Sequence, residues 1–373
     1  MNTNQRAGAL QGIRVLDLSR ILGGPLCGQI LGDHGADVLK VEPPQGDDTR
    51  AWGPPFQDGV SSYYRGLNRN KRLQFLDLSQ PEGQQAVLAL MEQADVVVEN
   101  FKIGTMEKWG IGWEQLRERF PRLIWCRVSG FGADGPLGGL PGYDACAQAM
   151  CGLMSVNGDA DGEATRVGLP VVDMVTGLNA AVGILLALNE REKSGLGQFV
   201  DMTLFDCAIS LLHPHAANFF YSGKTPQRSG NAHPNIAPYE TFETQTGAIF
   251  LAVGNNTHFA GLLRVLSAEH LGADPRFVTN AERLKHRDAL REALGALLAS
   301  QDAAVLADKL LRHGVPAAPV LTVPDILSHP HTAHRNMVMH EGDYHAVASP
   351  IKLSRTPASL RRLPPKLGEH NEG

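Results

Sequence analysis

Near its start the chain reads Gly12-Ile-Arg-Val-Leu-Asp-Leu18, then Gly23-Gly-Pro25, then Ala36-Asp-Val-Leu-Lys-Val41. The first and last of these segments are short apolar runs of the kind that form buried strands. Pro25 suits the first turn of a helix, because its missing N–H would have no partner there. This order predicts a strand, a helix and a second strand, the unit from which parallel sheets are built.

The same alternation continues along the first half of the chain. Further strands are predicted near residues 72–78, 95–99, 123–128 and 198–204, and helices near residues 81–94, 144–154, 174–192 and 207–221. Strands separated by helices form a mostly parallel sheet that is covered on both faces. We therefore expect an α/β fold with a doubly wound, Rossmann-like large domain.

A change of composition marks a second unit. Residues 222–238 are rich in Gly, Pro, Ser and Asn, which is typical of a linker. Two short strands and three helices are predicted between this linker and residue 312, and the tail from residue 329 is expected to be extended. The second unit should therefore be a smaller α+β domain.

The composition argues against several classes of protein. The 373 residues include 34 Lys and Arg against 39 Asp and Glu, and a net charge of −5 disfavours binding to nucleic acid. Five cysteines without a CxxC pair favour a reducing cytoplasm over a disulfide framework or a zinc ribbon. The histidines show no strong metal-ligand spacing, so we expect no metal. A polar N-terminus and an apolar run near residues 178–188 that is too short for a bilayer predict no membrane association.

The turn Ser19-Arg-Ile-Leu-Gly-Gly-Pro25 follows the first strand and is a candidate ligand site. In a doubly wound sheet this turn borders the usual binding crevice, and a helix N-terminus there favours phosphate. A plain turn without a ligand is an equal alternative, because the segment is not GxGxxG. The basic cluster Asn68-Arg-Asn-Lys-Arg72 could pair with phosphates, although a solvated loop is the favoured interpretation of its charges.

Asp173 stands in the otherwise apolar run Leu169-Pro-Val-Val-Asp-Met-Val-Thr-Gly177. A carboxylate among apolar neighbours can be desolvated and reactive. However, Asp directly before an apolar helix is also a good N-cap, and from the residues alone the cap is the favoured interpretation.

Several motifs follow one another along nearly the whole chain, from about Gly12 to His370. Besides the first strand and turn, they are Gly35-Ala-Asp-Val-Leu-Lys-Val-Glu42, Asn68-Arg-Asn-Lys71, Val98-Glu-Asn-Phe101, Gly135-Pro136, Pro141-Gly-Tyr-Asp144, Val172-Asp-Met-Val-Thr-Gly177, Gly230-Asn231, Ala237-Pro-Tyr239 and Ser349-Pro350. In number and order they resemble the family III CoA-transferases, which include formyl-CoA transferase.

The resemblance replaces the cap interpretation of Asp173, because the family's catalytic carboxylate falls on this residue. It implies an enzyme of class EC 2.8.3 in which Asp173 attacks an acyl-CoA and passes through an aspartyl–acyl anhydride and an aspartyl-CoA thioester. No prosthetic group is implied, since coenzyme A and acyl-CoA are substrates together with a free carboxylic acid.

The resemblance also places binding residues. Those matched to the CoA site are Ile21, Leu22, Leu76, Asn100, Phe101 and Lys108. Pro43 stands where some members carry an Arg for the adenine or a phosphate, and Lys71 or Arg72 is expected to substitute for it. Trp52, Tyr63 and Tyr143 match aromatic positions near the acyl group.

The acceptor is expected to be a dicarboxylate and the donor succinyl-CoA. The stretch from Gly46 to Phe56, with His215-Ala-Ala-Asn218 and Gly254-Asn-Asn256, resembles the succinyl-CoA–glutarate (hydroxymethylglutarate) branch. Arg20, Arg50 or Arg166 would hold the distal carboxylate. Oxalate is less expected, since the long glycine loop of oxalate-specific members is missing.

Two other functions stay open. The α-methylacyl-CoA racemases use a His in a Gly-His-Asp segment, which here reads Gly142-Tyr143-Asp144. A phenol with a pKa of about 10 is a poor general base, so Tyr143 favours a transferase. The other alternative is a CoA carrier or regulator without catalysis, against which the motif around Asp173 argues.

The fold implied by the resemblance is a ring-shaped chain in an interlocked homodimer. Residues 1–222 would form the first part of the large domain, and residues 223–328 the small domain. Residues 329–373 would return to the large domain as a C-terminal segment.

Overall fold

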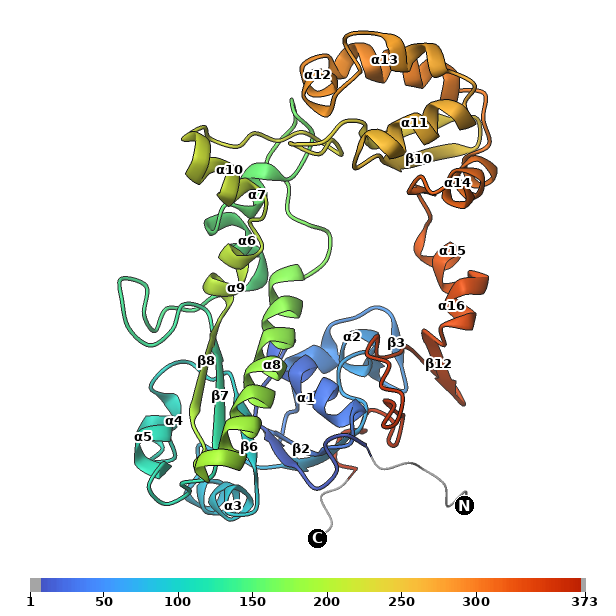
Figure 1. Ribbon diagram of the computed structural model, residues 1–373. Helices are drawn as coiled ribbons and strands as arrows, with labels where there is room; N and C mark the ends of the chain where they lie inside the picture. Colours follow the sequence, from blue (N-terminus) through green and yellow to red (C-terminus); the bar gives the residue numbers. More distant parts are fainter. Residues whose placement is uncertain (1–7, 370–373) are drawn as a thin grey trace. The chain divides into compact units, whose positions relative to one another are not determined.

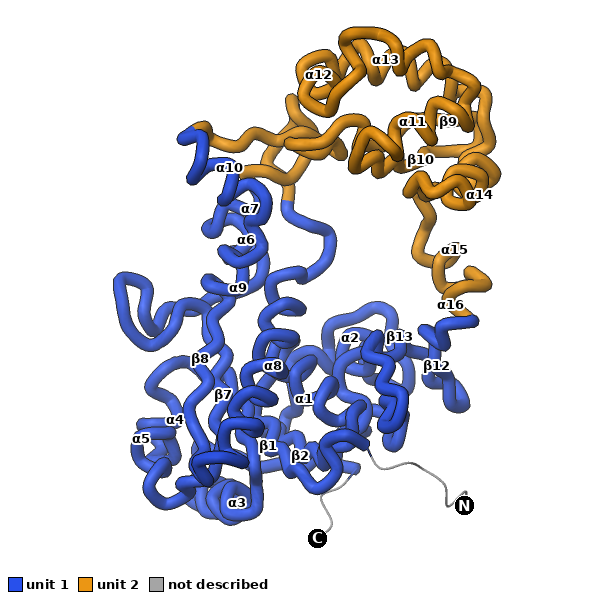
Figure 2. Tube along the Cα trace, viewed as in Figure 1, with its two compact units in different colours: residues 1–154, 166–223, 334–373 blue, residues 155–165, 224–333 orange. Residues whose placement is uncertain are grey.

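The computed structural model describes residues 8–369 and divides into two compact units, each with its own colour in Figure 2. The first unit comprises residues 1–154, 166–223 and 334–373, and the second comprises residues 155–165 and 224–333. Residues 155–165 and 329–333 therefore belong to the second unit, whereas the boundaries predicted from the sequence place them in the large domain and in its C-terminal segment. The terminal residues 1–7 and 370–373, which were assigned to the two ends of the large domain, lie outside the described part.

A six-stranded sheet forms the centre of the first unit (Figure 1). Its strands are β1 (Arg14–Asp17), β2 (Asp37–Glu42), β5 (Lys71–Phe75), β6 (Val96–Glu99), β7 (Ile124–Ser129) and β8 (Phe199–Thr203). They lie in the order β5-β2-β1-β6-β7-β8, and every neighbouring pair is parallel. By chain order this is 3-2-1-4-5-6, the strand order of dinucleotide-binding sheets, so the predicted α/β sheet is confirmed.

Successive residues of the strands serve opposite faces of the sheet, because side chains alternate along a strand. Val15 belongs to the core under α1 (Gly23–Asp33) and α8 (Val171–Ser194). Leu16 belongs to the opposite core, under α3 (Pro81–Met91) and its neighbours. These neighbours are α4 (Thr105–Lys108) and α5 (Trp113–Leu116).

The 24-residue helix α8 is longer than the sequence predicted, and by length and composition it would pass for a membrane span. Its inner face, with Ala180, Ile184 and Ala187, is buried in the core against the sheet. It is therefore a core helix of this unit. The other face carries exposed apolar side chains, namely Met174, Leu178, Val182, Leu185 and Leu186.

Two predicted helices are each divided. Residues 144–154 form α6 (Asp144–Met150) and part of α7 (Leu153–Val156). Residues 207–221 form most of α9 (Leu204–Ser210) and α10 (His215–Ser222). Pro214 stands between the latter two, where its ring and missing N–H prevent a continuous helix.

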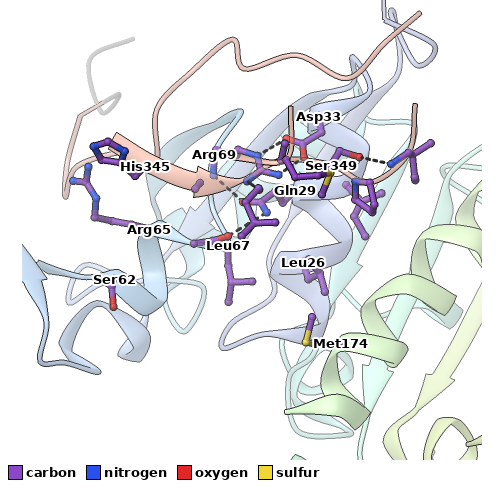
Figure 3. Close-up of a pocket in the computed structure, with 18 of the residues that line it drawn as sticks. Leu26, Gln29, Asp33, Ser62, Arg65, Leu67, Arg69, Met174, His345 and Ser349 are labelled. Atoms are coloured by element: carbon purple, nitrogen blue, oxygen red, sulfur yellow. Dashed lines mark hydrogen bonds and ion pairs between the residues drawn. The ribbon is translucent and has the colours of Figure 1, made fainter. Parts of the chain in front are cut away.

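The C-terminal residues pack on the first unit. The hairpin β12 (Val338–Glu341) and β13 (Tyr344–Val347) is bound through Arg69, which pairs with Asp33 and donates to the carbonyl of Val347 (Figure 3). The Asn70 side chain then holds the tail: it donates to the carbonyl of Ser359 and accepts the N–H groups of Arg361 and Arg362.

The second unit has its own core around an antiparallel sheet in the order β11-β10-β9. Its elements are β9 (Tyr239–Thr244), β10 (Gly247–Ala252), α11 (Asn256–Val265), η2 (Glu269–Ala273), α12 (Asn280–Lys285), α13 (Arg287–Leu298), α14 (Ala303–Arg312), β11 (Ala317–Pro319), α15 (Val323–Ser328) and α16 (Pro330–His334, which ends in the first unit).

The sequence missed a small region of the first unit, made of η1 (Asp48–Ala51), β3 (Phe56–Gln57), β4 (Val60–Ser61) and α2 (Ser62–Arg65).

Candidate active site

A cavity of about 300 Å³ lies at the carboxyl ends of β1 and β6. The strand order reverses between these two strands, and doubly wound sheets bind ligands at this point, because the flanking connections run away from each other there. Ile21, Leu22 and Gly23 line the cavity after β1, and Asn100 and Phe101 line it after β6. Asp173 and Tyr143 also line it. The structure therefore brings the expected nucleophile together with five expected binding residues, namely Ile21, Leu22, Asn100, Phe101 and Tyr143.

The turn after β1 is held in a strained shape. Ile21 has a φ of 71°, a left-handed conformation that is unfavourable for a β-branched residue and that clusters at functional sites. The Asn100 side chain fixes the preceding residue, because it accepts the N–H of Arg20 and donates to its carbonyl, both at 2.8 Å. Asn100 thus bridges the ends of β1 and β6.

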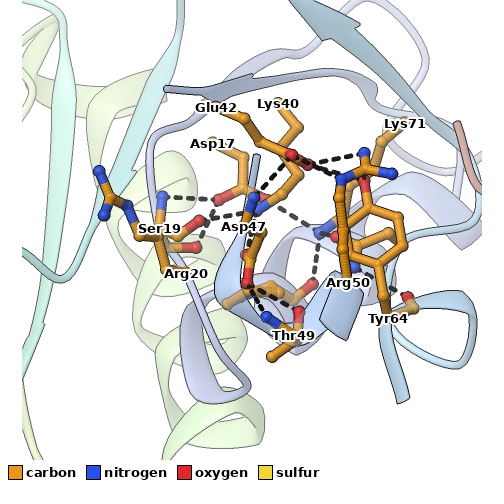
Figure 4. A network of polar contacts seen from close by, with 12 residues as sticks. Asp17, Ser19, Arg20, Lys40, Glu42, Asp47, Thr49, Arg50, Tyr64 and Lys71 are labelled. Atoms are coloured by element: carbon orange, nitrogen blue, oxygen red, sulfur yellow. Dashed lines mark hydrogen bonds and ion pairs between the residues drawn. The ribbon is translucent and has the colours of Figure 1, made fainter. Parts of the chain in front are cut away.

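A buried network of charges lies beside the turn and binds it through Ser19 (Figure 4). The ammonium of Lys40 donates to the carbonyl of Ser19 at 2.7 Å and pairs with Asp47 at 3.1 Å. Asp17 accepts the N–H and the hydroxyl of Ser19 and pairs with Lys71 at 2.8 Å. Burial alone would raise the pKa of Asp17, but the charges of Lys71 and Lys40 outweigh it and lower this pKa.

Asp173 lies in the first turn of α8, which packs closely against the start of α1. A side chain at Gly177 would place its Cβ 2.6 Å from the carbonyl oxygen of Gly23, so only glycine allows this approach. The carboxylate of Asp173 is thereby brought to the turn after β1. Burial and the charge of Asp144 raise the pKa of Asp173 to about 7.

The N-terminus of α8 is capped by another residue. The N-cap position is Pro170, which has no side-chain cap, and Asp144 accepts the N–H groups of Val172 and Asp173 at 2.8 and 3.1 Å. The cap interpretation of Asp173 is therefore wrong, because a carboxylate from α6 satisfies these donors.

The aromatic residues expected near the acyl group lie in the same region. Trp52 and Tyr63 meet edge to face with their ring centroids 5.3 Å apart. Burial, followed by the charges of Asp173 and Asp144, raises the pKa of Tyr63 to about 12. Tyr63 thus stays a neutral phenol that can donate a hydrogen bond near the nucleophile.

Leu76 lines a second cavity, of about 290 Å³, together with Phe101, Arg20 and Pro43. Phe101 borders both cavities, and the guanidinium of Arg20 lies over its ring at 5.5 Å. The cation that lines the cavity beside Pro43 is therefore Arg20, whereas Lys71 or Arg72 was expected to provide the phosphate contact there. Lys108 ends α4 and is exposed.

Three expected binding residues are corrected by the structure. Lys71 is fully buried and donates to Asp17, Asn68 and the carbonyl of Pro25, so no donor is left for a phosphate. Arg72 pairs with Asp37 at the amino ends of the strands, the opposite edge of the sheet from the cavity.

Arg50 is the third corrected residue. Its guanidinium forms two hydrogen bonds to Glu42, at 2.7 and 3.0 Å, and further ones to Tyr64 and the carbonyl of Pro365. It is therefore committed inside the protein and cannot hold the distal carboxylate of a substrate. Arg166, also considered for this role, is exposed and donates to the carbonyl of its neighbour Val167.

Sequence reasoning missed the roles of Asp144 and Lys40. Lys40 sits inside the buried run of β2, and a lysine in such a run signals a buried ion pair. Asp144 and Gln148 are four residues apart on α6, the spacing at which side chains meet. Within residues 8–369, no three His, Cys, Asp or Glu side chains are grouped so as to hold a metal.

Replacing Asn100 by Ala should raise the KM for acyl-CoA about tenfold, because the strained turn at Ile21 loses both hydrogen bonds that fix Arg20. Steady-state kinetics at saturating acceptor measures this change. Asn231→Ala, which removes one exposed hydrogen bond to Thr241 in the second unit, is the control and should leave KM unchanged. An unchanged KM for Asn100→Ala would show that the turn holds its shape without this bridge.

Comparisons with known proteins show the family to which the chain belongs. The family model described as CoA-transferase family III matches residues 10–371. A succinate–glutarate CoA-transferase of Agrobacterium fabrum is 40% identical over 98% of this chain and 94% of its own length. A succinyl-CoA:mesaconate CoA-transferase of Haloarcula hispanica is 40% identical over 97% and 94%.

A crystal structure of a CAIB/BAIF family protein from Brucella suis superposes with a TM-score of 0.88, at 41% identity and over 98% of each chain. The match of sequence and fold over nearly the full length, with Asp173 at the switch point of the sheet, leads to one conclusion: the chain belongs to CoA-transferase family III.

Proposed function

We propose that this enzyme moves CoA from succinyl-CoA to a free dicarboxylic acid, with Asp173 as the covalent nucleophile. The observation that carries the proposal is the place of Asp173: it lines the cavity at the switch point together with Ile21, Leu22 and Gly23 of the strained turn, and it lies next to Gly23. Covalent catalysis suits this exchange, because it divides one difficult transfer into easier steps.

The reaction balances as four acyl transfers. A carboxylate oxygen of Asp173 attacks the thioester carbonyl, and CoA leaves as thiolate, which gives an aspartyl–acyl anhydride. The thiolate then attacks the aspartyl carbonyl, which releases the donor acid and leaves an aspartyl-CoA thioester. The acceptor carboxylate attacks this thioester and expels the thiolate; the thiolate attacks the acceptor carbonyl, which frees the new acyl-CoA and the Asp173 carboxylate.

We place CoA along the residues after β1 and β6. Ile21, Leu22 and Asn100 would border the thioester end, and Leu76 would line the second cavity that Phe101 joins to the first. Lys108 is exposed at the end of α4 and would meet a phosphate of CoA. Phosphates attract such cations, and Arg20 is a further candidate at the second cavity.

The acyl group would lie against Trp52, Tyr63 and Tyr143. Tyr143 is 60% exposed and lines the cavity of Asp173. Both relatives named above are succinyl-CoA or succinate enzymes that act with a second dicarboxylate, which supports the same class of donor and acceptor here. With Arg50 committed to Glu42 and Arg20 placed at the second cavity, Arg166 remains as the candidate for the distal carboxylate.

A CoA-ester racemase remains the second candidate function. It needs a base on each side of the α-carbon, and besides Asp173 the cavity is lined by the phenol of Tyr143. Because a phenol is a poor general base, the presence of Tyr143 favours the transferase over the racemase.

We further propose that the chain works as an interlocked homodimer. The exposed apolar face of α8 continues into a cavity of about 670 Å³ that Met174, Leu178 and Leu26 line (Figure 3). A continuous apolar surface of this kind marks an interaction site. Light scattering after gel filtration should give twice the 40.2 kDa mass of one chain, and a monomer would contradict the proposal.

The function is tested by incubating the enzyme with succinyl-CoA and, separately, glutarate, mesaconate, oxalate and acetate. Mass spectrometry of the CoA esters should show a new dicarboxylyl-CoA and free succinate in equal amounts. No exchange with any acid, combined with deuterium uptake at the α-carbon of a 2-methylacyl-CoA, would favour the racemase.

The pH dependence follows from the pKa of Asp173, which burial and Asp144 raise to about 7. Only the ionised carboxylate attacks, so kcat/KM should fall about tenfold for each pH unit below this pKa and level off above it. The expected acid limb therefore lies near pH 7, far above the ordinary pKa of an aspartate of about 4. A flat profile between pH 5 and 8 in the initial rates with succinyl-CoA would contradict this assignment.

A further inference from the structure

Two side chains of α6 reach the segment that leads into α8. Gln148 is fully buried and Asp144 nearly so. The amide nitrogen of Gln148 donates to Asp144 Oδ1 at 2.7 Å and its amide oxygen accepts the N–H of Val167 at 2.8 Å. The other oxygen of Asp144 accepts the N–H groups of Val172 and Asp173. The pair therefore clamps residues 167–173 at both ends.

The orientation of the Gln148 amide is determined by its partners. The N–H of Val167 can only donate and the carboxylate of Asp144 can only accept. A flipped amide would face a donor with its nitrogen and an acceptor with its oxygen. Gln148 in turn directs Asp144, so that its second oxygen points at the free N–H groups of α8.

These bonds replace a cap that the segment itself lacks. The N-cap Pro170 provides no side-chain acceptor, and the first N–H groups of a helix need one. Asp144 also places a negative charge at the N-terminus of α8, where the helix dipole favours it. The first turn of α8 carries Asp173, so its place depends on this contact.

We propose that Asp144 and Gln148 are positioning residues of the CoA transfer, which hold the carboxylate of Asp173 at the cavity through the N-terminus of α8. This inference rests on the proposed role of Asp173 as nucleophile. Neither residue needs to touch the substrate: Gln148 is enclosed, and Asp144 acts through the backbone of Val172 and Asp173.

The charged and titratable groups around Asp173 make the role measurable. Asp144 of α6 and Tyr63 of α2 interact with it, and Lys102 lines the cavity from the loop after β6. Among the described residues that line the cavity, those of α1 and α9 carry no charge. Since Asp144 raises the pKa of Asp173 together with burial, neutralising it should lower that pKa.

The test compares Asp144→Asn, Gln148→Leu and the unchanged enzyme in the succinyl-CoA exchange assay. Asp144→Asn should move the acid limb of kcat/KM to lower pH and reduce kcat at the plateau about tenfold, because the new amide places N–H groups against the donor of Gln148. In Gln148→Leu the new side chain has nearly the volume of Gln148, and Asp144 keeps its charge. It should reduce kcat with little change in KM for acyl-CoA.

Asp206→Asn is the matched control, since Asp206 is an acidic residue in the first turn of α9 whose charge adds to burial in raising the pKa of Cys151 and of Asp201. It should leave both the acid limb and kcat unchanged. An acid limb and kcat that stay in place in Asp144→Asn would overturn the inference. If Asp144→Asn does not fold, Gln148→Leu decides, and an unchanged kcat in that variant overturns it as well.

The proposed function and this inference can fail separately. Exchange that persists in Asp173→Asn would overturn the role of Asp173 itself. If Asp173→Asn is inactive while Asp144→Asn keeps both its acid limb and its kcat, only the positioning role is overturned. Asp144→Glu gives a further check, because it keeps the charge but lengthens the side chain: the acid limb should stay and kcat should fall.

Discussion

Replacing Asp173 by Asn is expected to lower kcat/KM for CoA transfer by about 10⁴-fold or more. The amide has nearly the shape of the carboxylate, so the N–H bonds to Asp144 and the contact of α8 with α1 remain. It carries no negative charge and cannot form the anhydride. CoA should still bind, since none of the cavity residues after β1 and β6 is changed.

Three measurements test this expectation. Exchange of succinyl-CoA with a dicarboxylate is followed by mass spectrometry, CoA binding by calorimetry, and the covalent intermediate by hydroxylamine trapping at Asp173. Asp173→Ala guards against deamidation of the new Asn. The control is Asp201→Asn on β8, another aspartate whose pKa burial raises, which lies outside the cavity and should keep full activity. Activity of Asp173→Asn and Asp173→Ala within tenfold of the unchanged enzyme would contradict the covalent mechanism.

Replacing Lys71 by Met should reduce the free energy of unfolding by about 3–5 kcal/mol. Lys71 and Asp17 are both fully buried, and the ammonium makes hydrogen bonds to Asp17, to Asn68 and to the carbonyl of Pro25. Without it, Asp17 loses its closest opposite charge in the interior and two other acceptors lose their donor. Urea unfolding, followed by circular dichroism, measures the change.

Arg72→Met is the matched control, because Arg72 is the next residue and also forms a salt bridge. Its pair with Asp37 is partly exposed, and such pairs contribute about 1 kcal/mol or less. If both variants lost equally little stability, the buried network would not depend on Lys71. Comparing the two variants also distinguishes a structural role of Lys71 from a role in binding CoA. If Lys71 bound CoA, Lys71→Met would change the KM for acyl-CoA and leave the free energy of unfolding unaffected.

The sequence predicted the sheet well because its signals are local. Apolar runs and the helix-starting Pro25 place β1, α1 and β2, and the parallel order then places the cavity. The cap of α8 was assigned wrongly because its acceptor, Asp144, lies 29 residues before Asp173 and is brought there only by the packing of α6. No local pattern around Asp173 could reveal it.

The cationic residues show the same limit. Lys71 and Arg72 are neighbours on β5, but side chains alternate along a strand, so one enters the interior and the other does not. A basic cluster in the sequence cannot tell which faces a ligand. Arg50 is likewise occupied by a residue of another element, because its guanidinium donates to Glu42 of β2.

The anchoring of the tail on Asn70 has a consequence for synthesis on the ribosome. Asn70 leaves the exit tunnel about 290 residues before its partners Ser359, Arg361 and Arg362. Asn70 therefore lacks its partners in the tail while most of the second unit, which is nearly continuous in sequence, emerges and folds. The first unit is therefore completed only after the second unit has been translated, and a chain that stops before residue 359 has its six strands but lacks the contacts that anchor the tail on Asn70.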